Sequence, residues 1–173
     1  MILANTIKYH SHTFAVPSFS GRTDGVEKIA EKLISDVKLA NIYGTQDIAK
    51  VRIKDKLYDV HTTGGEYFSI KENENSLGFM VVVPRMYEGK TCYSVSELRN
   101  ETGPCGLGTK LMQIGLKAHK DSGKTGEFRA HDVLLEAEEF YEKLGFVEDP
   151  KREGQWFLPK ENEHILENYK GGL

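Results

Sequence analysis

The chain has 173 residues, of which 39% are hydrophobic and 28% are charged, and this composition excludes a wholly disordered protein. The length is near the usual size of a single domain, so we expect one compact domain over residues 1–173. The formal net charge of −3 argues against a general attraction to nucleic acid or to an anionic membrane.

The sequence carries no signal for export, for membrane insertion or for a metal. Residues 1–8 lack the basic lead and the apolar run of a signal peptide, and no stretch approaches the roughly 20 apolar residues of a membrane span. The two cysteines, Cys92 and Cys105, are too few and too far from any histidine cluster for a zinc site. We therefore expect a cytoplasmic protein with no membrane partner and no metal.

The first half of the chain predicts a helix followed by strands. Apolar residues recur at three- and four-residue steps over 24–41, which predicts an amphipathic helix. The period then changes, and 51–60 predicts a hairpin or two short strands, followed by a strand over 67–70. The continuous apolar run 77–83 predicts a buried strand that ends at Pro84.

The next segments predict a strand, a glycine turn and a helix. Residues 91–99 alternate in the manner of a strand, which places Val95 and Glu97 on the same face. Three glycines follow within 103–108, and 109–119 then has the apolar side of a helix.

The last third of the chain alternates strand and helix again. Residues 128–133 predict a short strand, 134–144 a helix, and 146–147 with 155–158 a final strand pair. The tail from Glu161 is polar. This order of elements predicts a mixed α/β sheet.

The glycine turn at 103–108 has the features of an anion site. Glycine lets the backbone approach a ligand closely, and the helix that follows presents unpaired amides and positive partial charge. A nucleoside triphosphate loop needs lysine directly after the last glycine, but here Thr109 intervenes before Lys110. A dinucleotide turn needs a glycine where Leu111 stands. A glycine turn that serves only to bend the chain is the alternative interpretation.

A second segment points to the ligand. Residues 140–146 read Phe-Tyr-Glu-Lys-Leu-Gly-Phe. Together with the glycine turn, this run resembles the GCN5-related N-acetyltransferase (GNAT) superfamily, and the resemblance covers roughly 77–158. It implies an α/β fold with a mixed, mostly antiparallel central sheet flanked by helices, the GNAT-like acyl-CoA N-acyltransferase fold. It also implies acetyl-CoA as co-substrate.

The resemblance implies positions for the bound co-substrate. Leu98 matches the strand residue whose backbone pairs with the pantetheine arm, and Asn100 would offer the next backbone contact. Lys110 would add charge near the phosphates. Backbone amides in the turn would face the pyrophosphate, namely those of Cys105, Gly106, Leu107, Gly108 and Thr109.

Catalytic roles are implied in the same way. Tyr141 matches the tyrosine that protonates the departing thiolate, a role that suits a phenol. Glu97 is our candidate for the base that accepts a proton from the amine, with His131 as a further candidate. Two positions depart from the family pattern, because Gly103 replaces an Arg or Gln and Leu134 replaces an Asn.

We therefore expect an acetyltransferase that moves an acetyl group from acetyl-CoA to an amine acceptor by direct attack. The acceptor could be a small molecule or a protein. The alternative is a non-catalytic module of GNAT fold that binds CoA or a protein partner, which the two departures motivate. A third reading, modification of a large partner such as charged transfer RNA, is opposed by the acidic net charge. A homodimer is compatible with the sequence.

Overall fold

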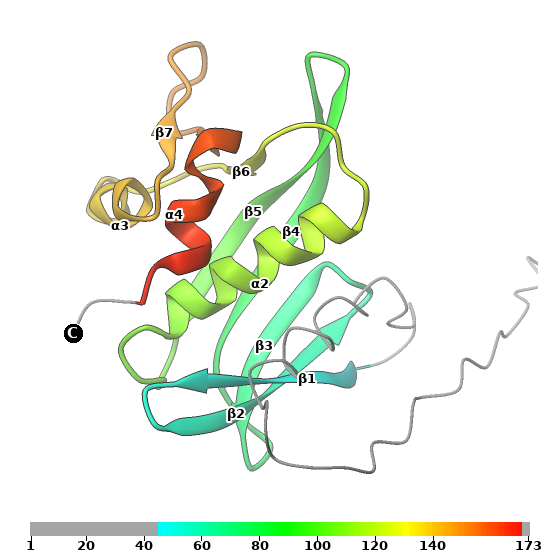
Figure 1. The fold of residues 1–173 in the computed structure, drawn as a ribbon, viewed down its shortest axis with the longest axis vertical. Helices are drawn as coiled ribbons and strands as arrows, with labels where there is room; N and C mark the ends of the chain where they lie inside the picture. Colours follow the sequence, from blue (N-terminus) through cyan, green and yellow to red (C-terminus); the bar gives the residue numbers. More distant parts are fainter. Residues whose placement is uncertain (1–44, 171–173) are drawn as a thin grey trace, which may run out of the picture.

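The computed structural model describes residues 45–170, and for 45–49 it describes the backbone alone. The helix predicted over 24–41 lies outside these residues. Within them the fold is α/β, with an eight-stranded, mostly antiparallel mixed sheet whose strand order is β1-β2-β3-β4-β5-β6-β8-β7 (Figure 1). The coarse prediction of a mixed sheet is thus confirmed. The strands are Thr45–Ile53, Lys56–Thr63, Tyr67–Glu72, Asn75–Tyr87, Lys90–Asn100, Phe128–Ala130, Val147–Glu148 and Trp156–Leu158, in chain order from β1 to β8.

The strands predicted over 51–60, 67–70, 77–83 and 91–99 fall within β1 to β5, which form a continuous antiparallel meander. Strand β4 differs from the prediction because it runs through Pro84 to Tyr87. Val82 donates its amide to Glu66 O on the β3 side, at 2.8 Å. The nitrogen of Pro84, two residues later, points to the same side. There β4 has passed Tyr67, the first residue of β3, so the proline removes no hydrogen bond of the ladder.

A bulge in β5 corrects a second prediction. Val95 lies opposite Val82 and Glu97 opposite Val81, so Ser96 is the extra residue. A bulge reverses the facing of the residues that follow it. Val95 is therefore buried on the helix-covered side, whereas Glu97 lies on the other face of the sheet.

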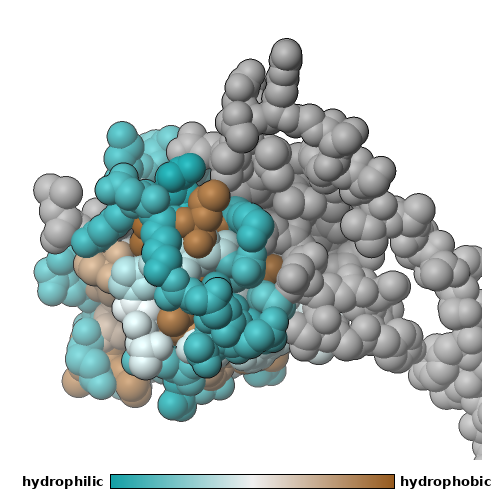
Figure 2. Space-filling model, turned by 90° about the horizontal axis from the view of Figure 1, so that it is seen from below, coloured by the Kyte–Doolittle hydropathy of each residue, from teal (hydrophilic) through white to brown (hydrophobic). Residues whose placement is uncertain are grey.

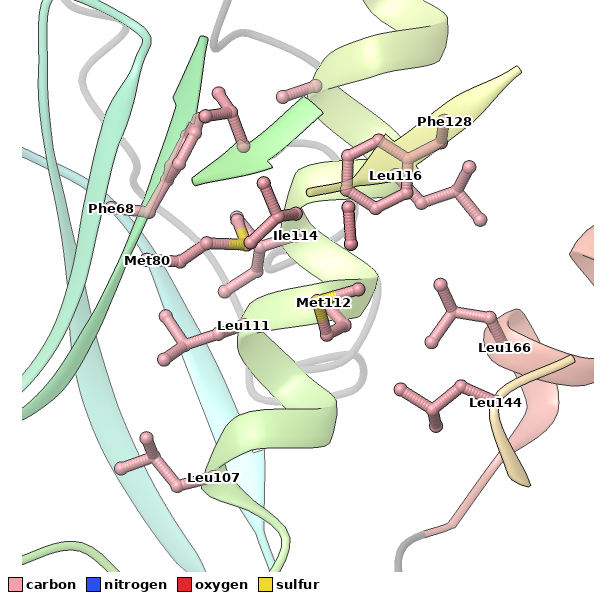
Figure 3. Close-up of a cluster of buried hydrophobic side chains, with 14 of the residues drawn as sticks. Phe68, Met80, Leu107, Leu111, Met112, Ile114, Leu116, Phe128, Leu144 and Leu166 are labelled. Atoms are coloured by element: carbon pink, nitrogen blue, oxygen red, sulfur yellow. The ribbon is translucent and has the colours of Figure 1, made fainter. Parts of the chain in front are cut away.

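Helix α2, Leu107–Asp121, lies across one face of the sheet (Figure 1). Its apolar side chains meet Phe68 and Met80 from the strands, as Figure 3 shows. Gly115 permits the close approach, because a Cβ there would lie 2.6 Å from the Met80 Cε and 2.9 Å from the Phe128 Cζ. Helix α2 thus joins the meander to the C-terminal strands.

The C-terminal helices are shorter than predicted or were not predicted at all. The helix predicted over 134–144 divides into a 3₁₀ turn, Leu135–Ala137, and α3, Glu138–Lys143. The polar tail, in which no helix was predicted, forms α4, Glu163–Asn168, after a 3₁₀ turn at Lys160–Asn162. Leu166 of α4 is fully buried and, with Leu144, faces α2 (Figure 3).

The described helices and surface can be compared with what a membrane protein needs. No helix within 45–170 is long and apolar enough to cross a bilayer. The face seen in Figure 2 is mainly hydrophilic, with separate hydrophobic side chains between the polar ones.

Candidate functional site: a cleft where the sheet opens

The sheet opens between β5 and β6, its parallel pair of strands. These strands pair at Ser94 with Arg129 and at Val95 with Ala130, and the His131 amide then donates to Val95 O at 3.1 Å. After this point the chain turns away toward α3, whereas β5 continues to Asn100 (Figure 1). The β6-facing edge of β5 over 96–100 therefore has no partner strand within residues 45–170.

A cleft of about 780 Å³ occupies this opening. One wall is β5, the base is the glycine turn with the start of α2, and the opposite wall is the segment from β6 to α3. The lining residues are Val95, Ser96, Glu97, Leu98, Arg99, Asn100, Cys105, Gly106, Gly108, Thr109, His131, Asp132, Val133, Leu134, Glu136, Ala137, Glu139, Phe140, Tyr141, Lys143 and Tyr169.

The glycine turn is fixed by its own hydrogen bonds and by the start of β4. Asn100 Oδ1 accepts a hydrogen bond from the Gly103 amide at 2.9 Å. The carbonyl of Leu77 accepts hydrogen bonds from the amides of residues 101–103, at 2.9 to 3.1 Å. Gly106, with φ of 94°, then takes the left-handed conformation that directs the chain into α2.

The start of α2 leaves two lining amides unpaired. The amides of Gly108 and Thr109 form no hydrogen bond within residues 45–170, as expected in the first turn of a helix. The Leu107 amide donates instead to Pro104 O at 3.1 Å. The Phe140 ring packs nearby, and a Cβ at Gly108 would lie 3.6 Å from it, an ordinary van der Waals contact. The exposed end of α2 is therefore a place where an anion can be bound.

Most of the predicted site residues line this one cleft: Glu97, Leu98, Asn100, Cys105, Gly106, Gly108, Thr109 and Tyr141. Leu107 and Lys110 are not among the lining residues. The Leu107 side chain is fully buried in the core and its amide is already bonded. Lys110 follows the lining residues Gly108 and Thr109 in α2, and its role near the phosphates stays a prediction.

The departure at Gly103 has a packing reason. A Cβ at this position would lie 2.2 Å from the Leu107 Cδ1 and 3.0 Å from the Asn100 Oδ1. The space that a larger residue needs is thus occupied by the side chain that anchors α2. The turn must be glycine here as long as Leu107 keeps this packing.

Tyr141 is held in the wall of the cleft by aromatic neighbours. Its ring meets Phe140 and Phe146 edge-on, each with 5.4 Å between ring centroids, and the residue is only 6% exposed. Burial raises the pKa of Tyr141 to about 12. The phenol is therefore protonated at neutral pH and is able to donate a proton into the cleft.

Glu97 lies at the rim of the cleft and is paired with a cation. Its Oε1 lies 2.6 Å from the Arg99 Nε, and the two side chains are 39% and 65% exposed, respectively. Because of the bulge at Ser96, this pair lies on the face of the sheet opposite to α2.

Ser94 is a residue of the site that sequence reasoning missed. Its Oγ lies 2.9 Å from the Nδ1 of His131, which lines the cleft, and Ser94 itself is fully buried. Burial lowers the pKa of His131, and the Arg85 charge acts in the same direction, whereas Asp132 opposes them. No local signal in the sequence identifies this pair, because it depends on the register of β5 against β6.

The comparisons with known proteins add no identification. No protein-family model matches the chain, and no curated protein matches it. Among the residues that the structure describes, no cluster of His, Cys, Asp or Glu is arranged to hold a metal ion.

Proposed function

We propose that the protein is an N-acetyltransferase of GNAT type, which transfers an acetyl group from acetyl-CoA to an amine acceptor in the cytoplasm. The observation that carries the proposal is the opening between β5 and β6 with the glycine turn at its base. An unpaired strand edge and a helix start here line a single cleft. A long ligand matches this combination if its amide groups can bind the strand edge and its phosphates can bind the helix start.

The residues of the cleft fit acetyl-CoA in two respects. The free edge of β5 over 96–100 offers backbone groups to an amide-bearing arm, as an added strand would use them. The amides of Gly108 and Thr109 offer donors to phosphate oxygens, assisted by the dipole of α2. When bound, acetyl-CoA would supply the activated acetyl thioester.

Tyr141 has the protonation state that the release of a thiolate requires. Its hydroxyl forms no hydrogen bond within the described part of the chain and is available to a ligand in the cleft. We propose that it donates a proton to the departing sulfur, while the acceptor amine attacks directly and no covalent enzyme intermediate forms.

The variant Gly108→Asp tests the position of the phosphates. A Cβ at Gly108 makes only ordinary contact with Phe140, and an acidic residue in the first turn favours the helix. The same charge repels phosphate at short range, so we expect acetyl-CoA to bind about tenfold more weakly or worse. Titration calorimetry measures the Kd, and thermal unfolding shows that the fold is kept.

Gly108→Asn is the matched control, because it adds similar bulk without charge. We expect it to keep acetyl-CoA binding within about threefold of the wild type, since about 0.7 kcal/mol covers such a steric change. Equal binding by all three proteins, or no binding at millimolar acetyl-CoA, would refute the proposed site. Binding without transfer to a broad panel of amines would favour the non-catalytic module instead.

A further inference from the structure

The Ser94–His131 pair lies where the two walls of the cleft separate. Ser94 belongs to the last paired positions of β5, and the bulge at Ser96 follows directly. The His131 backbone is fixed by its bond to Val95 O, and its side chain is only 11% exposed. The imidazole thus has a fixed place at the point where a ligand between the strands would end.

The hydrogen bond to Ser94 determines what the other ring nitrogen can do. If Nδ1–H donates to Ser94 Oγ, Nε2 carries the lone pair and can accept a proton. The serine oxygen accepts this bond from both the neutral and the protonated ring, so the contact persists when Nε2 gains a proton. The Asp132 carboxylate lies 4.0 Å from Nε2 and is 89% exposed, and its charge favours the protonated ring.

Glu97 is the weaker candidate for the same task. Its Oε1 lies 2.6 Å from the Arg99 Nε, so one oxygen of this exposed carboxylate is already held by a cation. Within residues 45–170, the charged group that lies near the His131 Nε2 is an anion, Asp132, whereas Arg85 acts on the ring only through its field.

We propose that His131 is the proton acceptor for the acetyl acceptor, which arrives as an alkylammonium ion, and that Ser94 is the positioning residue that keeps Nε2 available. The inference rests on the proposed function and names the class of its second substrate. Carboxylates of the same wall, Asp132 and Glu136, favour a cationic acceptor, since neither is in an ion pair with Lys or Arg within residues 45–170.

The protons balance as follows. The ammonium nitrogen starts with three protons, of which one moves to His131 Nε2 and one stays on the amide product. The C–N bond forms as the C–S bond breaks, and Tyr141 gives its hydroxyl proton to the departing sulfur. The third proton then leaves the nitrogen and restores the Tyr141 hydroxyl. The products are an N-acetyl amide, a thiol and an imidazolium, which then releases its proton to water.

The tautomer of His131 can be measured without any substrate. Long-range ¹⁵N–¹H NMR spectra of the full chain distinguish Nδ1–H from Nε2–H. We expect Nδ1–H in the wild type, and titration below the ordinary pKa of about 6.5. Ser94→Ala should abolish the tautomer preference, whereas the exposed His164 should keep its spectrum as an internal control. An Nε2–H ring in the wild type, or an unchanged ring in Ser94→Ala, would overturn the inference.

Two amines test the proton transfer itself. Phenylethylamine is an ammonium ion at neutral pH, whereas aniline is already neutral and needs no base before attack. We expect His131→Gln to lower kcat/KM for phenylethylamine by about 100-fold or more, and for aniline by much less. The Kd of acetyl-CoA should stay unchanged. The acid limb of the pH profile for phenylethylamine should disappear in His131→Gln and shift in Ser94→Ala.

The outcomes separate the two proposals. An equal loss for both amines in His131→Gln overturns the base role and leaves the acetyltransferase proposal intact. A loss confined to Glu97→Gln assigns the role to Glu97 and also overturns the inference. Acetyl-CoA binding with no transfer to either amine by the wild type overturns the proposed function, and the catalytic role of His131 with it.

Discussion

The two parts of the sheet are built in different ways. Strands β1 to β5 pair in sequence, and the longest of them, β4 and β5, have 13 and 11 residues. The C-terminal strands β6, β7 and β8 have only 3, 2 and 3 residues. Backbone ladders therefore hold the meander, whereas the C-terminal part depends on side chains and short helices for its position.

The cleft follows from this mismatch in length. Because β6 stops after two pairs with β5, the edge of β5 beyond Val95 is left free, next to the turn into α2. The meander supplies a rigid wall and the helix start, while the C-terminal part supplies His131 and Tyr141. The geometry of the site thus depends on the side chains that fix the C-terminal part, and three predictions probe them.

The largest effect is expected at the buried ion cluster of Asp149. This carboxylate pairs with Arg129 of β6 and lies 2.9 Å from Arg152, and the Arg129 and Asp149 side chains are 6% and 8% exposed. Arg129 also lies over the Tyr87 ring, at 4.2 Å. Removing one partner of a buried pair costs about 3–5 kcal/mol, so we expect Asp149→Ala to lower the free energy of unfolding by this amount in urea titrations.

The meander provides the control for this prediction. Lys50 and Asp59 form an ion pair between β1 and β2 in which both side chains are well exposed. Asp59→Ala should change the urea midpoint little, since exposed pairs contribute little to stability. A similar loss in both variants would show that the C-terminal part does not depend on its buried charges in the way we infer.

A smaller effect is expected where α4 meets α2. Gln113 Nε2 donates to Leu166 O at 2.8 Å and to Tyr169 O at 2.9 Å. Gln113→Met keeps the length of the side chain but removes the donor, so we expect it to lower the free energy of unfolding by about 1–2 kcal/mol in urea titrations. Hydrogen exchange should rise mainly over 163–170. Faster exchange throughout β1 to β5 would contradict a local role for this bond.

The sequence predicts the meander well because its information is local. The strands alternate with period 2 or run apolar, and the glycines mark the turn that leads into α2. Each of these features is determined by residues within a short window.

The remaining features depend on partners far apart in the chain. The bulge at Ser96 appears only in the register of β4 against β5, and the Ser94–His131 bond only in that of β5 against β6. Helix α4 was not predicted because its sequence is mostly polar and Leu166 is its buried residue. The place of Leu166 is set by a hydrogen bond from Gln113 of α2. Periodicity does not report such contacts.

The smallest effect is a pH dependence that comes from His119, the buried histidine of α2. Its Nδ1 accepts from the Tyr93 amide at 3.2 Å, and its Nε2 lies 3.0 Å from Gly126 O, so the neutral ring joins α2 to β5 and to the loop before β6. Burial lowers the pKa of His119, although the Gly126 carbonyl opposes this shift. The unfolded chain, with a pKa of about 6.5, therefore binds the proton more readily than the folded protein does.

Stability due to His119 should be fully present above pH of about 6.5 and should fall as the pH drops below that value, until the folded pKa is reached. The slope for one proton is at most about 1.4 kcal/mol per pH unit. We expect His119→Gln to unfold with a weaker pH dependence than the wild type in urea titrations on either side of this value, whatever its stability at neutral pH.

His131→Gln should remove a smaller part of the same dependence, because the pKa of His131 is lowered in the same direction and its ring is less buried. The exposed His164 serves as control, and a pH dependence that His164→Gln weakens as much as His119→Gln does would contradict the role of the buried ring.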